Sequence, residues 1–78
     1  MKLIGRYKDI TGQEKIEFDI TDDTIIRDII ATFVKKYPAV EKDKGRMMVI
    51  KNNMYTSYDT TVGKDDEIAL SPPVVSGG

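Results

Sequence analysis

The segment TIIRDIIATFVKKYP, residues 24–38, decides the fold because it is the one long stretch with helical periodicity. Its apolar residues recur at intervals of three and four and lie on one side of an amphipathic helix: Ile26, Ile29, Ile30, Phe33, Val34 and Tyr37. Pro38 ends the helix because it cannot continue the hydrogen-bond ladder. Residues 21–23, Thr-Asp-Asp, offer N-cap side chains and favourable negative charge. We therefore predict one helix over residues 24–37.

Strand patterns lie on both sides of this helix. Before it, residues 2–8 alternate imperfectly, and residues 15–20 bury Ile16, Phe18 and Ile20 on one face. The outward Ile4 either belongs to a partner-binding face or is a lone exposed apolar residue. After the helix we predict strands over 47–50, 54–56 and 67–70, with a tight Asn-containing turn at 51–53.

Strands on both sides of one helix predict a mixed sheet with that helix packed across one face. The first and last strands should be parallel neighbours, because the connection between them carries the helix. The predicted fold class is α+β, a β-grasp (ubiquitin-like) roll with four to five strands and one main helix. Val62 should plug the core, and the methionines are expected to fill it, with a plastic recognition surface as the alternative. We divide the chain into a domain at 1–71 and a flexible C-terminal tail at 72–78.

Composition excludes several classes of chemistry. The 78 residues include 12 basic and 13 acidic side chains, so the net charge is −1 and gives no sign of nucleic-acid or acidic-membrane binding. Cysteine and histidine are both absent, which excludes disulfides, thiol nucleophiles, the usual zinc sites and imidazole acid–base catalysis. No apolar run has the roughly 20 residues that a membrane span needs. A cytoplasmic protein is expected.

A catalytic site is hard to assemble from the domain's own side chains, since a lysine base would need burial that the sequence does not reveal. The serines at 57, 71 and 76 have no histidine to activate them. The acidic groups at 22–23 and 65–67 are explained by a helix cap and a turn, so no metal site is expected. The charged run at 41–46 is expected to be a solvated loop, with a partner-docking patch as the alternative. We therefore expect no enzymatic activity from this chain alone and no bound cofactor.

The tail Pro72-Pro73-Val74-Val75-Ser76-Gly77-Gly78 contains the remaining candidate reactive group. Two prolines stiffen the exit from the domain. Two glycines can enter a slot too narrow for residues with side chains. The Gly78 carboxylate is a poor electrophile by itself, but as an adenylate it can accept a sulfur or amine nucleophile. That activation requires another enzyme. Gly78 and Gly77 are the predicted reactive end, and residues 72–76 are predicted to contact the partner.

The C-terminal twenty residues carry a resemblance to a known family. The turn and acidic pair of 59–66, the strand Glu67-Ile68-Ala69-Leu70 and the Pro-Pro-Val-Val-Ser-Gly-Gly ending resemble the small subunit of molybdopterin synthase and the archaeal small modifier proteins. Asn52-Asn53 matches the family's Asn-containing hairpin turn, and the upstream hairpin and helix fit the same β-grasp order. The tail is one valine longer than the common family pattern.

The resemblance implies a function for Gly78. A ubiquitin-activating-type enzyme would use ATP to adenylate the carboxylate, which is then converted to a thiocarboxylate. The tail would insert into the large subunit of molybdopterin synthase and donate sulfur for molybdenum cofactor synthesis. Alternatively, the activated Gly78 would form isopeptide bonds with target lysines, or supply sulfur for tRNA thiolation. A second alternative is a non-reactive β-grasp interaction module.

Overall fold

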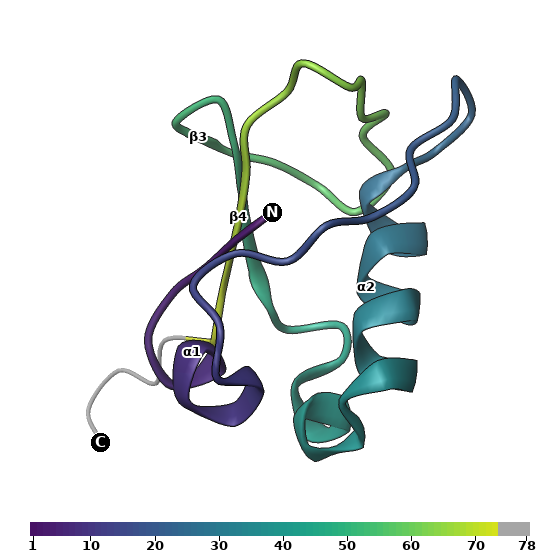
Figure 1. Ribbon diagram of the computed structural model, residues 1–78. Coiled ribbons are helices and arrows are strands. Elements are labelled where there is room, and N and C mark those ends of the chain that lie inside the picture. Colours follow the sequence, from purple (N-terminus) through teal and green to yellow (C-terminus); the bar gives the residue numbers. More distant parts are fainter. Residues whose placement is uncertain (74–78) are drawn as a thin grey trace.

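The computed structural model describes residues 1–73 and contains a mixed four-stranded sheet with one long helix across one face (Figure 1). The strands are β1 (Lys2–Leu3), β2 (Met48–Lys51), β3 (Met54–Tyr55) and β4 (Ile68–Ser71), in the order β1-β4-β2-β3. The helices are α1 (Arg6–Thr11), α2 (Ile26–Lys36) and the 3₁₀ helix η1 (Pro38–Asp43). No helix among the described residues is long and apolar enough to cross a membrane.

Strand β4 lies between β1 and β2, so the last strand of the chain pairs with the first. It pairs in parallel with β1 and antiparallel with β2, so the predicted parallel contact of first and last strands is confirmed. The register places Leu70 beside Leu3 on one side and Val49 on the other. These three residues are all at least 98 % buried and form the sheet side of the core. Ile68 and the predicted core residue Val62 are buried as well.

Helix α2 covers the core face of the sheet with its predicted apolar stripe. Ile26, Ile29, Ile30, Phe33 and Val34 are buried, and Tyr37 packs against them. The helix ends at Lys36, one residue before the predicted end at 37, and Tyr37 is the C-cap residue that precedes Pro38.

The predicted N-cap of α2 at 21–23 is wrong. The helix begins at Ile26, and the residue before it, Ile25, is held by an isolated bridge to Thr61. The carboxylate of Asp28 accepts the Ile25 amide at 3.1 Å. A carboxylate in the first turn therefore satisfies a donor that residues 21–23 were expected to serve.

The predicted first strand over residues 2–8 is wrong beyond Leu3. Gly5 has φ 63° and ψ −137°, a conformation that turns the chain out of the sheet. Helix α1 follows at once and ends at Gly12 in the left-handed region. The second predicted strand, 15–20, is reduced to an isolated antiparallel bridge between Lys2 and Lys15. The connection between the two N-terminal segments is therefore longer than predicted, and fewer of their residues are paired.

The hairpin of β2 and β3 has the predicted turn. Asn52 and Asn53 both have positive φ, 50° and 69°, which asparagine tolerates better than most residues. The expectation that the methionines fill the core holds for Met47, which is buried, and is wrong for Met54. Met54 and Tyr55 are 73 % and 70 % exposed on this edge strand.

Candidate functional site

The candidate site starts where β4 leaves the sheet and becomes the tail. Leu70 accepts a hydrogen bond from the Ile4 amide at 3.0 Å, which holds the end of β4 against the first strand. Pro72 then lies over Gly5: a Cβ atom added to Gly5 would be 3.7 Å from the Pro72 ring. The Ser71 hydroxyl donates to the Pro72 carbonyl at 3.2 Å. The root of the tail therefore has a defined direction up to Pro73.

Helix α1, which begins beside Pro72, is fixed by a buried polar cluster. The Tyr7 hydroxyl donates to Asp43 Oδ2 at 2.8 Å, and Arg6 forms an ion pair with the same oxygen. Asp43 is only 2 % exposed, which corrects the prediction that residues 41–46 form a solvated loop throughout. The cluster joins α1 to η1 and so fixes the helix whose N-cap residue, Gly5, lies next to Pro72.

Burial and hydrogen bonding have opposite effects on the pKa of Asp43 but act in the same direction on the pKa of Tyr7. Burial opposes ionisation of Asp43, but the bonds from Tyr7 and Arg6 outweigh it and lower the carboxyl pKa. For Tyr7, burial and the bond to Asp43 both raise the pKa of the phenol. At neutral pH the cluster therefore consists of a carboxylate, a neutral phenol and a guanidinium, and no buried side-chain nitrogen or oxygen of residues 1–73 lacks a hydrogen-bond partner.

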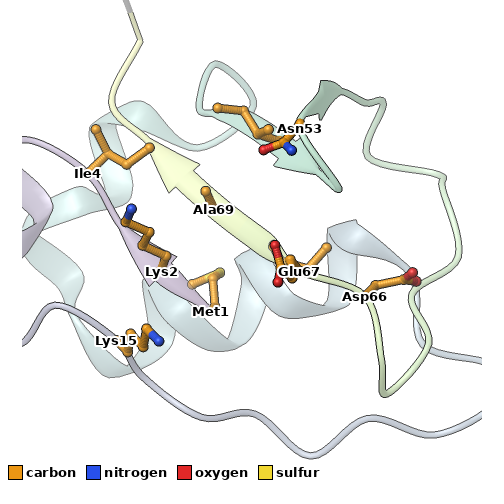
Figure 2. A pocket seen from close by; sticks show the side chains of 10 residues that line it. Met1, Lys2, Ile4, Lys15, Asn53, Asp66, Glu67 and Ala69 are labelled. Carbon is orange, nitrogen blue, oxygen red and sulfur yellow. The ribbon is translucent and has the colours of Figure 1, made fainter.

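A shallow hollow of about 560 Å³ lies on the sheet face opposite α2. Figure 2 shows β4 crossing it, with Ala69 at its centre and Ile4 next to the end of the strand from which the tail leaves. Lys2 and Lys15 lie on one side and the carboxylates of Asp66 and Glu67 at the far end. Ile4, predicted to face outward, is half-buried here. The hollow is open and of mixed polarity.

The acidic group at 65–67 has a structural role, as predicted. Asp66 accepts the Gly63 amide at 2.7 Å and the Asn52 side-chain amide at 2.9 Å. These hydrogen bonds, the Gly63 amide first and Asn52 next, lower the pKa of the Asp66 carboxyl. The bonds join the turn before β4 to the β2–β3 hairpin.

The serines at 57 and 71, which were not expected to be nucleophiles, make local hydrogen bonds. Ser57 Oγ lies 3.1 Å from Thr60 Oγ1, and Ser71 bonds to the neighbouring carbonyl. Neither contact resembles an activated nucleophile.

The structure places only part of the predicted reactive tail. Pro72 and Pro73 are half-buried at the end of β4. The predicted contact residues Val74, Val75 and Ser76, and the predicted reactive Gly77 and Gly78, lie outside the described residues. Sequence reasoning missed the supports of the tail root, which are Gly5, Arg6, Tyr7 and Asp43. The one available signal was the glycine that interrupts the alternation of the first predicted strand.

The parallel β1–β4 pair, the antiparallel β2–β3 hairpin and the helix across one face define a ubiquitin-like β-grasp protein. The whole chain, residues 1–78, matches the ThiS family, and the protein belongs to that family.

Two relatives carry different names. The molybdopterin synthase sulfur carrier subunit of Arabidopsis thaliana is 26 % identical over 76 residues, which cover 97 % of this chain and 78 % of the relative. Small archaeal modifier protein 1 of Haloferax volcanii is 28 % identical over 85 residues, covering 99 % and 97 %.

Solved structures agree on the fold. The crystal structure of the Haloferax volcanii modifier superimposes with a TM-score of 0.77 at 27 % identity, covering 99 % of this chain and 94 % of that one. The solution structure of the Haloferax volcanii HVO 2177 protein gives 0.83 at 20 % identity, covering 97 % and 82 %. The chain is therefore a small non-catalytic protein of the sulfur-carrier and ubiquitin-like modifier type.

Proposed function

We propose that this protein is a sulfur carrier for molybdopterin synthesis and that Gly78 is its reactive residue. A ubiquitin-activating-type enzyme joins the carboxylate to AMP from ATP and releases pyrophosphate. Hydrosulfide then attacks the acyl carbon, AMP leaves, and a thiocarboxylate remains. The tail delivers this sulfur to the large subunit of molybdopterin synthase. The domain binds no cofactor in this scheme, because ATP is held by the activating enzyme.

The observation that carries this proposal is the continuity between β4 and Pro72. The central strand of the sheet runs directly into the tail, and Pro72 rests on Gly5 at the start of α1. A rigid root reduces the conformational entropy lost when an extended tail enters a partner's slot. The relative from Arabidopsis thaliana, named as a sulfur carrier subunit, supports the same role.

A protein-modifier role is the second candidate, and one observation favours it. This chain covers 97 % of the Haloferax volcanii modifier but 78 % of the plant sulfur carrier subunit. In this role the ε-amine of a target lysine attacks the activated Gly78 and forms an isopeptide bond with loss of AMP. Sulfur donation for tRNA thiolation uses the same thiocarboxylate. The cytoplasmic location stays a prediction.

Intact mass spectrometry of the protein purified from its own cells tests these roles. A sulfur carrier shows a mass increase that matches one oxygen replaced by sulfur, without a ladder of conjugates on denaturing gels. A modifier shows conjugates that disappear when Gly77 and Gly78 are deleted. If the deleted chain keeps every partner and rescues the same cells, the protein is a non-reactive interaction module and the proposal is wrong.

A further inference from the structure

The charges of this protein are divided unevenly between two parts of the fold. Residues 6–11 and 35–46 together hold seven of the twelve basic residues and three of the thirteen acidic ones. The basic members are Arg6, Lys8, Lys35, Lys36, Lys42, Lys44 and Arg46. The remainder of the chain has five basic and ten acidic residues. A net charge of −1 therefore conceals a strongly dipolar molecule.

The fold brings the two basic segments together. Arg6 and Tyr7 of α1 both bond to Asp43 of η1, and the Gln13 side chain just after α1 donates to the Tyr37 hydroxyl at 3.3 Å. Figure 1 shows α1, η1 and the C-terminal end of α2 at one end of the molecule. We call this end, residues 6–11 and 35–46, the basic end.

The tail leaves from the basic end. Pro72 packs on Gly5, the residue directly before α1. The loops that carry most of the acidic residues, around 19–23 and 59–67, lie at the opposite end in Figure 1. The tail therefore starts from the positively charged end of the domain, and most of the negative charge lies at the other end.

The positive charges of the basic end are accessible. All seven basic residues are exposed. Arg6 is paired with the buried Asp43, whereas the other six form no salt bridge with any acidic residue of segment 1–73. The charge of Arg6 is balanced by that of Asp43. The remaining surface charge of the basic end is six cations and two anions, the exposed Asp9 and Glu41. The 41–46 run is therefore one part of a larger surface.

We propose that the basic end is the docking surface for the enzyme that adenylates Gly78, and that this enzyme surrounds its tail slot with acidic side chains. The inference rests on the proposed function, which requires such an enzyme whether the product is a thiocarboxylate or a conjugate. Complementary charge around the slot orients the molecule tail first and raises the association rate, with little effect on the chemistry inside the slot.

A nucleic acid fits this surface less well than an acidic protein. The ten acidic residues outside the basic end would repel a long polyanion. The aromatic residues of the basic end, Tyr7 and Tyr37, are buried and half-buried, so they offer no stacking platform for bases. An acidic rim of limited size around a slot matches a positive surface confined to one end.

Paired charge reversals test the inference. The variant Lys42→Glu/Lys44→Glu alters the basic end, and Lys15→Glu/Lys64→Glu makes the same change in charge elsewhere; all four lysines are exposed. ATP–pyrophosphate exchange by the activating enzyme of the same cells gives kcat/KM at several salt concentrations. Far-ultraviolet circular dichroism and thermal unfolding verify that both variants fold.

We expect the basic-end variant to lose about tenfold or more in kcat/KM at low salt, mainly through KM, and to approach the unaltered protein at high salt. The matched control should change less than about twofold. Equal losses in both variants, or a loss independent of salt, contradict the inference alone. No exchange with the unaltered chain contradicts the proposed function and removes the basis of the inference with it. Binding of unfractionated tRNA that is lost only in the basic-end variant would reassign the surface to nucleic acid.

Discussion

The Tyr7 hydroxyl donates a 2.8 Å hydrogen bond to Asp43 across 36 residues of sequence, in a place where both side chains are almost fully buried. The bond joins α1 to η1, and Gly5, the N-cap residue of α1, lies next to the Pro72 ring. A buried carboxylate that loses a donor keeps its desolvation cost, so each of its bonds has a large effect on folding.

Replacing Tyr7 with phenylalanine should lower the free energy of unfolding by about 1–3 kcal/mol, because Asp43 is left with Arg6 alone. Denaturant unfolding at neutral pH measures the loss. Tyr55→Phe is the matched control, since Tyr55 is 70 % exposed and should change stability by less than about 0.5 kcal/mol. Equal losses of stability in both variants would show that the Tyr7–Asp43 hydrogen bond does not contribute more than an exposed tyrosine hydroxyl.

Asp43 predicts a specific dependence of stability on pH. Its pKa lies below the ordinary value of 3.8 because the bonds from Tyr7 and Arg6 outweigh burial. The folded state therefore holds the proton less tightly than the unfolded state. The stabilisation is fully present above the ordinary pKa and is lost as pH falls through the lower folded pKa. Asp43→Asn should be less stable at pH 7 and should lose less stability than the unaltered protein between pH 5 and pH 2. Parallel pH profiles for the two proteins would contradict this assignment.

Gly5→Ala should destabilise the protein by about 1–2 kcal/mol, because φ 63° with ψ −137° strains any residue that has a Cβ atom. The added atom would be 3.7 Å from the Pro72 ring, an ordinary contact. The cause is therefore the backbone and not a clash. Combining Gly5→Ala with Pro72→Ala should give additive losses in thermal unfolding. Recovery of stability in the double variant would identify a clash instead.

The β2–β3 turn allows a contrast between two neighbouring asparagines with positive φ. Asn53→Gly should leave stability unchanged or raise it by up to about 1 kcal/mol, since glycine prefers this conformation. Asn52→Gly should lower it by about 1 kcal/mol or more. Its side chain donates to Asp66 at 2.9 Å and accepts the Glu67 amide at 2.8 Å, and glycine loses both bonds. Thermal unfolding of the two variants side by side decides the point.

The parts of the fold that the sequence predicted are those with a local pattern of their own. Helix α2 has a long apolar stripe ended by Pro38, and β4 alternates buried Ile68 and Leu70. The missed helix α1 has only six residues, too few for a helical period to emerge, and its start depends on the backbone of Gly5.

The site was predicted in part for a related reason. The proline pair at 72–73 marks the exit from the domain in the sequence itself, and the structure places it at the end of β4. Asp43, in contrast, reads as one charge within a solvated run. Its partners Arg6 and Tyr7 are 37 and 36 residues away, so its burial depends on tertiary packing that no local pattern records.

The position of β4 also determines how the protein bears mechanical force. A pull on the tail that is directed along β4 acts on a strand hydrogen-bonded to β1 on one side and to β2 on the other. The force then acts parallel to both strand pairs, in shear, so the hydrogen bonds of each pair must break together. In an edge strand pulled sideways, the hydrogen bonds would break one after another. A partner that holds the tail can therefore apply tension while the domain stays folded. The time for which the domain withstands this tension is then set by its rate of forced unfolding.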